Sequence, residues 1–213
     1  YNTGKVSVTG DRARVGGVSG FNGKDIKNCY NTGEVSVAVD GGAVGGVCGD
    51  NDRGSRITNC YNTGKVSVTG SRDFVGGVCG MNADTIENCY FLTGTADKGT
   101  GDDTGEATKK TDSQFKSGEV AWLLQNDQED LVWGQKIGVD SYPKFSDSEN
   151  EKVLKAAFMN SDAEIQVAYA NYNTALTEPE FVVAEDEKID GWYENGDFSG
   201  NAWNFENGIV QDI

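Results

Sequence analysis

The sequence predicts a mainly β protein, in which a parallel β-solenoid of about three coils with a helix-containing cap is joined to a small C-terminal module. Three observations support this prediction. One segment recurs at intervals of 29 to 31 residues, short apolar alternations within each copy are bounded by Gly, Asn and Asp, and the composition changes after the last copy. Self-similarity at a fixed period is typical of repeat architectures, so the repeats decide the fold class.

The repeated segment reads Asn-Cys-Tyr-Asn-Thr-Gly, one further residue, and then Val-Ser-Val. Copies begin at Asn28 and Asn59, an opening copy is already under way at Tyr1, and a fourth begins at Asn88 and then diverges. Each copy continues through Val-Gly-Gly-Val-x-Gly to an Ile two residues before the next Asn. Period-two alternation in short segments predicts three strands per repeat. Three strands in about 30 residues indicate one coil of a parallel β-solenoid, with coils about 4.8 Å apart.

In such a solenoid, corresponding residues of successive coils stack into columns. We expect Val, Ile and Cys to form inward columns, two of which contain Cys29, Cys60 and Cys89, and Ser19, Cys48 and Cys79. Stacked thiols suggest metal binding or redox chemistry, but the cysteines lack CxxC spacing and fall at strand positions, which favours small buried hydrophobes. A column of Asn2, Asn31 and Asn62 can share amide hydrogen bonds between coils. The Gly-Gly pairs indicate tight corners, since a phosphate cradle requires a following helix.

The combination of NCYNTGxVS with VGGVxG resembles the GLUG-type repeat of large bacterial surface and secreted proteins, including some IgA-directed peptidases outside their catalytic parts. The resemblance covers residues 1–94. It implies a non-catalytic, extracellular β-solenoid.

Residues 95–145 are expected to cap the solenoid, because an open end exposes a core and unpaired strand edges. Residues 95–111 lack an apolar period and predict a loop. Their Asp residues suggest calcium, but no alternating ligand series ends in Glu, which favours a solvated loop. Near-helical apolar spacing predicts a helix over about 113–126, followed by short strands, an order similar to the tail of GLUG-type arrays. Trp122 and Trp133 are expected in the core, the alternative being a sugar site.

Residues 146–151 are polar and predict a linker, which is followed by a module at residues 152–213. This module resembles the internalin-type B-repeat of bacterial surface proteins, on the basis of Gly191, Trp192, Tyr193, Phe198, Trp203 and Phe205. The resemblance implies a small β-grasp-like α+β unit used as a stalk or interaction module. It places Trp192 and Trp203 in the core, the alternative being exposed aromatic residues that bind a ligand. The family continues into a last aromatic-rich strand, whereas this chain stops at Ile213, so we expect a truncated module.

The charge is concentrated in the C-terminal half. Residues 1–94 carry nine basic and nine acidic side chains, while residues 95–213 carry nine and 25, which accounts for the whole net charge of −16. An acidic half without a basic stripe predicts no nucleic-acid partner, and no run of about 20 apolar residues predicts a membrane-inserted segment. The chain has no histidine, the commonest general base and zinc ligand, and we expect no cofactor or metal. Because it begins within a repeat, we expect a piece of a longer protein.

These observations favour a non-enzymatic segment of a bacterial cell-surface or secreted protein, acting in adhesion, display or as a stalk. One alternative is a carbohydrate- or protein-binding module of a larger secreted hydrolase. Another is a solenoid enzyme on polysaccharide, which requires paired carboxylates; the turns offer Asp11, Asp40, Asp50, Asp52 and Asp73. No catalytic residue is assigned. The partner is expected to be an extracellular protein or glycan, and the candidate binding surface contains Phe21, Phe74, Met81, Arg14, Arg53 and Arg72.

Overall fold

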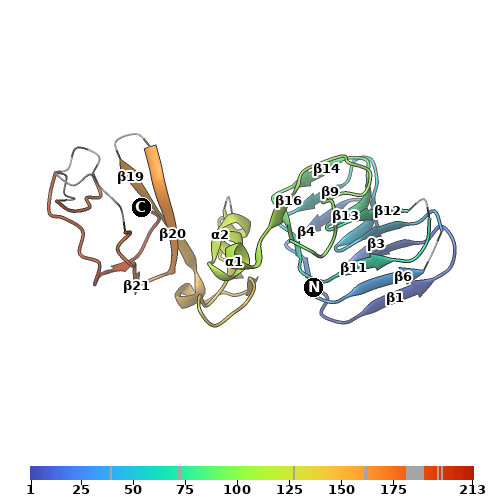
Figure 1. The fold of residues 1–213 in the computed structure, drawn as a ribbon, viewed down its shortest axis with the longest axis horizontal. Coiled ribbons are helices and arrows are strands. Elements are labelled where there is room, and N and C mark those ends of the chain that lie inside the picture. The colour runs from blue at the N-terminus through green and yellow to red at the C-terminus, as the bar shows by residue number, and fades with distance from the viewer. Residues whose placement is uncertain are drawn as a thin grey trace. The chain divides into compact units, whose positions relative to one another are not determined.

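A computed structural model describes residues 1–38, 40–71, 73–126, 128–160, 163–180, 190–195, 197 and 199–213. These residues form two compact units, Tyr1–Phe115 and Lys116–Ile213 (Figure 1). Both units are mainly β, and the described residues contain two α-helices. Neither of these helices has the length and apolar character that crossing a lipid bilayer requires.

The first unit is a stack of parallel strands between residues 6 and 92, which confirms the predicted solenoid (Figure 1). Corresponding strands of successive coils pair in register. The stacks are β1 (Val6–Thr9), β6 (Val35–Ala38) and β11 (Val66–Val68); β2 (Arg14–Gly16), β7 (Ala43–Gly45) and β12 (Phe74–Gly76); β3 (Ser19–Asn22), β8 (Cys48–Asn51) and β13 (Cys79–Asn82); β4 (Asp25–Lys27), β9 (Arg56–Thr58) and β14 (Thr85–Glu87); and β5 (Tyr30–Asn31), β10 (Tyr61–Asn62), β15 (Cys89–Leu92) and β16 (Ala107–Lys110).

The prediction of three strands per coil is wrong, because each full coil contains five shorter ones. Two corners account for the difference. Asn28, Asn59 and Asn88 have φ values of 52°, 53° and 49°, a left-handed conformation that Asn adopts more readily than most residues, and this turn separates the Ile strand from the Tyr strand. The second break follows the first Gly of the Gly-Gly pair and divides the Val-Gly-Gly-Val-x-Gly segment into strands such as β2 and β3.

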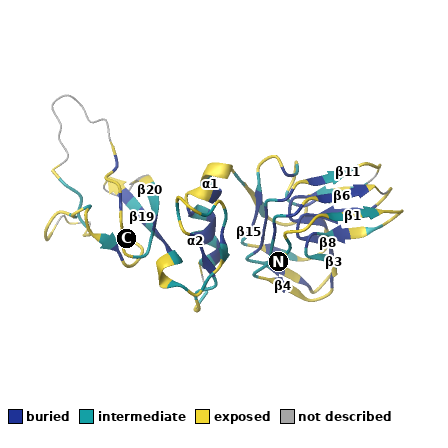
Figure 2. Cartoon of the chain, turned by 90° about the horizontal axis from the view of Figure 1, so that it is seen from below, coloured by how far each residue is buried: buried dark blue, intermediate teal, exposed yellow. Residues whose placement is uncertain are grey.

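Two apolar clusters fill the interior of the solenoid. One contains the Ile column with four of the cysteines, and the other contains Val15, Val35, Val37, Val44 and Val66. Cys48 pairs in register with both Ser19 and Cys79, and the amide of Cys29 donates to the Sγ of Cys60 at 3.3 Å. Figure 2 shows buried residues along the stacked strands and exposed residues in the turns. The predicted inward columns are therefore confirmed, although Cys29, in the first coil, is only half-buried.

Stacked polar and aromatic side chains fix the register between coils. The amide of Asn2 donates to Asn31 at 2.7 Å and that of Asn31 to Asn62 at 2.8 Å, so the predicted asparagine column is confirmed. A second ladder, of Asn22, Asn51 and Asn82, has the same geometry, with 2.7 Å between neighbouring amides. The rings of Tyr1, Tyr30 and Tyr61 stack 4.8 and 5.2 Å apart, which matches the spacing of paired strands.

One glycine of the repeat shows how closely two sheets approach. A Cβ atom on Gly49 would lie 2.5 Å from the carbonyl oxygen of Gly20 and 2.5 Å from the amide nitrogen of Val15. These distances are far below a van der Waals contact, so the backbones of the β2 and β3 stacks touch at a position where no side chain fits. The last Gly of Val-Gly-Gly-Val-x-Gly is therefore a packing requirement.

Residues 95–111, expected to be a solvated loop, instead form an irregular further coil as far as Lys110. The amides of Gly77 and Val78 donate to the carbonyls of Lys98 and Gly99, and β16 pairs in parallel with β15. The carboxylate of Asp102 accepts a bond from the amide of Asn82 at 2.7 Å. This segment therefore covers the end of the stack through backbone pairing, which requires no apolar period.

The single helix predicted over about 113–126 is divided into two, α1 (Asp112–Lys116) and α2 (Glu119–Gln125). Gly118 lies between them with φ 93°, a conformation that ends an α-helix and is strained for other residues. The buried Phe115 contacts the ring of Tyr61 in the first unit, with centroids 5.7 Å apart. Helix α2 belongs to the second unit, where it packs against β17 (Trp133–Gly134) and β19 (Val153–Asn160).

The second unit thus begins inside the segment expected to be the cap. Trp133 is fully buried, which confirms its expected core position. Trp122 is half-buried, and its indole Nε1 donates to the Asp212 carboxylate at 2.9 Å. The remaining elements are β18 (Lys144–Phe145), a 3-10 turn (Glu149–Glu151), β20 (Ala163–Asn171), β21 (Thr174–Ala175) and β22 (Gly208–Ile209).

The C-terminal residues contain two antiparallel pairs, β19 with β20 and β21 with β22. Leu154, Phe158 and Ile209 form their core, with Trp192 and Trp203 packed against it, as expected for these indoles. No α-helix occurs among the described residues after 152, so the β-grasp-like arrangement remains a prediction. Phe198, one of the residues behind the internalin-type resemblance, lies outside the described residues.

Candidate binding surface

Two columns on the outside of the solenoid bring most of the candidate residues together. In the β3, β8 and β13 stack, Phe21 pairs with Asp50 and Asp50 with Met81. In the β2, β7 and β12 stack, Arg14 pairs with Ala43 and Ala43 with Phe74. We name Arg14, Phe21, Asp50, Phe74 and Met81 the mixed strip. Phe21, Phe74 and Met81 are 45%, 39% and 38% exposed.

Arg14 joins the two columns. Its Nε lies 2.8 Å from a carboxylate oxygen of Asp50, one coil away, and its guanidinium carbon lies 5.0 Å from the ring centroid of Phe21. A guanidinium over an aromatic face is an attractive cation–π geometry. The Asp50 side chain is largely buried, so this ion pair holds the arginine in place while its outer face stays accessible.

The strip changes character from the first coil to the third. Phe74 and Met81 occupy in the third coil the positions that Arg14 and Phe21 occupy in the first. One end therefore presents a cation on an aromatic ring, and the other presents an aromatic ring and a thioether without a charge. Such a surface suits a ligand with an apolar face and an anionic or hydrogen-bonding group at one end.

The other two candidate arginines are not placed in the strip. Arg53 is exposed in the turn between β8 and β9. Arg72 lies outside the described residues. Sequence reasoning also missed that Asp50 is a partner of Arg14. The residues that correspond to Asp50 in the neighbouring coils are Phe and Met, and Asp50 is 36 positions from Arg14 in the sequence.

Carboxylates in the variable turns bind backbone groups of neighbouring coils. Asp40 accepts the amide of Ser71 at 2.8 Å, Asp73 accepts the amide of Gly42 at 2.6 Å, and Asp84 accepts the amide of Gly54 at 2.8 Å. The bond from Gly54 lowers the pKa of Asp84. Each of these bonds joins residues 30 or 31 positions apart, so the side chains act as braces between neighbouring coils.

In the second cysteine column a hydrogen bond between the two thiols lowers the pKa of Cys48 and raises that of Cys79. In the first column, Cys29 and Cys60 lack the properties of reactive thiols. A hydrogen bond to Cys60 and burial raise the pKa of Cys29, and burial raises the pKa of Cys60. The thiolate is the nucleophile and the metal ligand, so a raised pKa disfavours both functions. Among the described residues, no three or more His, Cys, Asp or Glu side chains form a group that could hold a metal ion.

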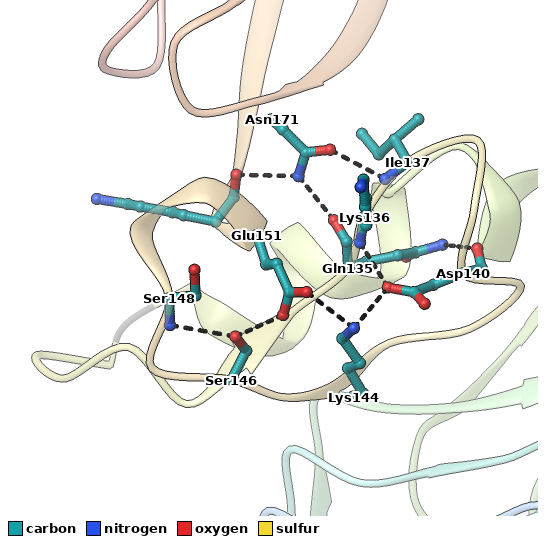
Figure 3. Close-up of polar contacts among 10 residues, drawn as sticks. Gln135, Lys136, Ile137, Asp140, Lys144, Ser146, Ser148, Glu151 and Asn171 are labelled. Atoms are coloured by element: carbon teal, nitrogen blue, oxygen red, sulfur yellow. Dashed lines mark hydrogen bonds and ion pairs between the residues drawn. The ribbon is translucent and has the colours of Figure 1, made fainter.

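A polar cluster in the second unit surrounds Lys144 (Figure 3). Its ammonium lies 2.9 Å from Glu151 and 3.0 Å from Asp140, and Ser146 donates to Glu151 at 2.7 Å. The hydrogen bonds to Glu151 and Asp140 raise the pKa of Lys144, and those from Ser146 and Lys144 lower the pKa of Glu151. Burial raises the pKa of Asp140, but bonds from the Lys136 amide and Lys144 more than offset this and lower it.

The same cluster continues to β20 through Asn171. Its side-chain amide donates to the carbonyl of Gln135 at 2.7 Å and its oxygen accepts the amide of Ile137 at 2.9 Å (Figure 3). The residues expected to form a linker, 146–151, are held in place as well: the amide of Ser146 donates to the carbonyl of Val132, and the carbonyl of Glu151 accepts the amide of Gln135. The cluster positions strands and keeps its charges paired, which makes it a structural element.

Comparison with known families gives one match. The family model described as "The GLUG motif" matches residues 11–36 and 40–69, which span the strands from β2 to β11. No curated protein and no solved structure matches the chain. The GLUG motif occurs in extracellular and cell-surface proteins. Residues 11–36 and 40–69 therefore match the GLUG motif, and the strands in them stack as coils of a parallel β-solenoid.

Proposed function

We propose that this chain is a non-enzymatic segment of a bacterial cell-surface or secreted protein, and that its solenoid adheres to an extracellular protein or glycan through the mixed strip. The observation that carries the proposal is that three exposed large apolar side chains lie in two adjacent strand columns, together with an arginine that pairs with Asp50 and covers the ring of Phe21. Exposed apolar side chains gathered on one surface mark interaction sites more often than isolated ones do.

The stack of coils supports the proposal that the solenoid presents the mixed strip to a partner. Asparagine ladders, stacked tyrosines and apolar columns hold each coil to the next, so the strip keeps its spacing over successive coils. A surface that must meet a partner at some distance from its anchor benefits from such a stiff support. If the chain acts only as a stalk or displays another part of the protein, the same stack of coils serves as the support and the mixed strip binds nothing.

The carboxylate braces support the non-enzymatic part. Three Asp residues of the turns bond to backbone amides, and Asp50 pairs with Arg14. A glycosidase site instead requires two carboxylates that face a common space at a defined separation. A binding module of a larger secreted hydrolase remains the second candidate, and it uses the same strip.

The test is a binding screen of the full chain on immobilised glycans and extracellular-matrix proteins. The strip variant carries Phe21→Thr, Phe74→Thr and Met81→Thr. The control carries Val139→Thr and Val210→Thr, apolar positions that are more exposed than those of the strip and lie in the second unit. We expect the strip variant to lose about tenfold or more in affinity, as for central apolar contacts of an interface, and the control to bind normally. Equal binding by both variants, or release of sugar products from a polysaccharide, would contradict the proposal.

A further inference from the structure

Among the residues that the structure describes, strand β20 pairs with β19 at one edge and with no strand at the other, which we call the open edge. Tyr172 donates its amide to the carbonyl of Lys152 at 2.9 Å, and hydrogen-bonded pairs alternate with non-bonded pairs in an antiparallel ladder. Counting back along β20, the backbone groups of Val167 and Tyr169 must point away from β19. On β19, their partners Ala157 and Lys155 point outward in the same way, and both bond to Ile213.

The backbone groups of Val167 and Tyr169 have no hydrogen-bond partner among the residues that the structure describes. Such an edge presents a row of donors and acceptors at strand spacing, which is the template that a further strand requires. The β19 edge is partly occupied, by Ile213, whereas the β20 edge is open. The two sides of this small sheet therefore differ in their capacity for an added strand.

A groove of about 550 Å³ runs beside the open edge. It is lined by residues 166 and 168–171 of β20, by residues 174–180 and by Ile137. Its apolar part includes Ala170 and Leu176, both buried. A groove along a strand edge accommodates the alternate side chains of an extended segment, while the edge bonds its backbone.

The charge around the groove determines whether a basic or an acidic segment can bind there. Glu178 and Glu180 line it, both are exposed, and within the described part of the chain neither has an ion-pair partner. The whole second unit carries 20 acidic and six basic residues. A segment with Lys or Arg at the positions facing these carboxylates is attracted, and an acidic segment is repelled.

We propose that the open edge of β20 binds an extended, basic peptide segment of another protein as an added strand. The backbone groups of Val167 and Tyr169 bond the segment, the groove takes its alternate side chains, and Glu178 and Glu180 pair with its cations. This site is separate from the mixed strip, so either proposal stands or falls without the other.

The probe is a labelled eight-residue peptide of alternating Lys and Val, titrated into the full chain. Two analogues are methylated on the two alternate sets of backbone nitrogens, and a third peptide replaces Lys by Glu. We expect one methylated analogue to lose about tenfold or more in affinity, since its edge-facing amides can no longer donate, and the Glu peptide not to bind. Full binding by both methylated analogues, or by the Glu peptide, would overturn the proposal.

Variants of the chain locate the site. Val167→Pro removes the outward amide, and Val167→Thr is the matched control that keeps it. Glu178→Gln with Glu180→Gln is compared with Glu194→Gln and Glu206→Gln, which change the net charge equally at other exposed positions. We expect the affinity for the Lys-Val peptide to fall about fivefold or more in Val167→Pro and in the Glu178→Gln, Glu180→Gln variant, and to stay unchanged in the two control variants.

Hydrogen exchange tests the edge without any substitution. Addition of the Lys-Val peptide should slow exchange at the amides of Val167 and Tyr169, which point outward. Unchanged exchange at both amides under saturating peptide would contradict strand addition. A concentration-dependent dimer of the chain alone that Val167→Pro abolishes would assign the edge to a second copy and overturn the proposal.

Discussion

The two units obtain their order in different ways. Residues 1–115 are almost neutral, with 12 basic and 14 acidic side chains, and repeat the same contacts in every coil. Residues 116–213 are strongly acidic and have no repeat, and their strands are held by single contacts, such as the buried Trp133 and the cluster around Lys144. In the first unit, the same few contacts recur in every coil and together stabilise the fold. In the second unit, each stabilising contact occurs at one place only.

The largest expected effect comes from the closest backbone contact of the solenoid. Gly49→Ala places a methyl group 2.5 Å from the Gly20 carbonyl and from the Val15 amide, so the sheets must separate. We expect a loss of about 3 kcal/mol in the free energy of unfolding of the first unit. Urea denaturation followed by circular dichroism measures it. Gly23→Ala is the control, because its added Cβ meets only a ring carbon of Phe21 at 3.4 Å; equal losses would contradict the close packing.

A smaller loss is expected when one rung of the asparagine ladder is removed. Asn31→Ala deletes bonds to Asn2, Asn62 and Gly33 in a fully buried position. The partners left unpaired account for about 2 kcal/mol of lost stability. Asn2→Ala, at the accessible end of the same ladder, should cost clearly less in the same denaturation experiment. If the two variants unfold at the same urea concentration, burial of the ladder has no energetic role.

The smallest effect is a pH dependence in the second unit. The carboxylates of Asp140 and Glu151 have lowered pKa values in the folded chain, so their contribution is present above their ordinary values of 3.8 and 4.5 and is lost as the pH falls through the lowered ones. Lys144 has a raised pKa, so its contribution is lost as the pH rises through that value, above 10.5. Lys144→Met should therefore destabilise the unit at pH 7, but not at a pH below both carboxylate pKa values.

We expect the difference between Lys144→Met and the unaltered chain to be under about 1 kcal/mol at pH 7, because the cluster is partly exposed to solvent. Paired urea denaturations at both pH values measure it, and the subtraction removes the effect of the other carboxylates. A difference that stays constant on acidification would mean that Lys144 acts through packing.

Sequence reasoning was most accurate where the repeat period could be used. The columns of cysteine and of Asn2, Asn31 and Asn62 follow from position alone, since in-register stacking brings identical residues together. The second ladder, through Asn51, recurs at the same period and was visible to the same reasoning. The five-strand coil was missed because left-handed asparagines such as Asn59 interrupt the strands without changing the apolar pattern.

Prediction failed where backbone pairing or a single residue decides the structure. Strand β16 has the sequence Ala-Thr-Lys-Lys, which shows no apolar alternation, yet its backbone pairs with β15. Gly118 divides the predicted helix although the apolar spacing runs through it. In the candidate surface, exposure of Phe21, Phe74 and Met81 was foreseen, but the Arg14–Asp50 pair depends on how two sheets meet at a corner.

The central claim is that the coils stack in register, because this register assembles both the core and the mixed strip. Engineered cysteines at Ser7 and Ser36, which pair directly in β1 and β6, test it. The control pair replaces Thr9 and Ser36, which are two residues out of register. A disulfide cannot form when the two Cα atoms are more than about 7 Å apart. After mild oxidation and peptide mapping, we expect a cross-link in the Ser7→Cys, Ser36→Cys variant and none in the control. A cross-link of equal yield in the control would contradict the stack.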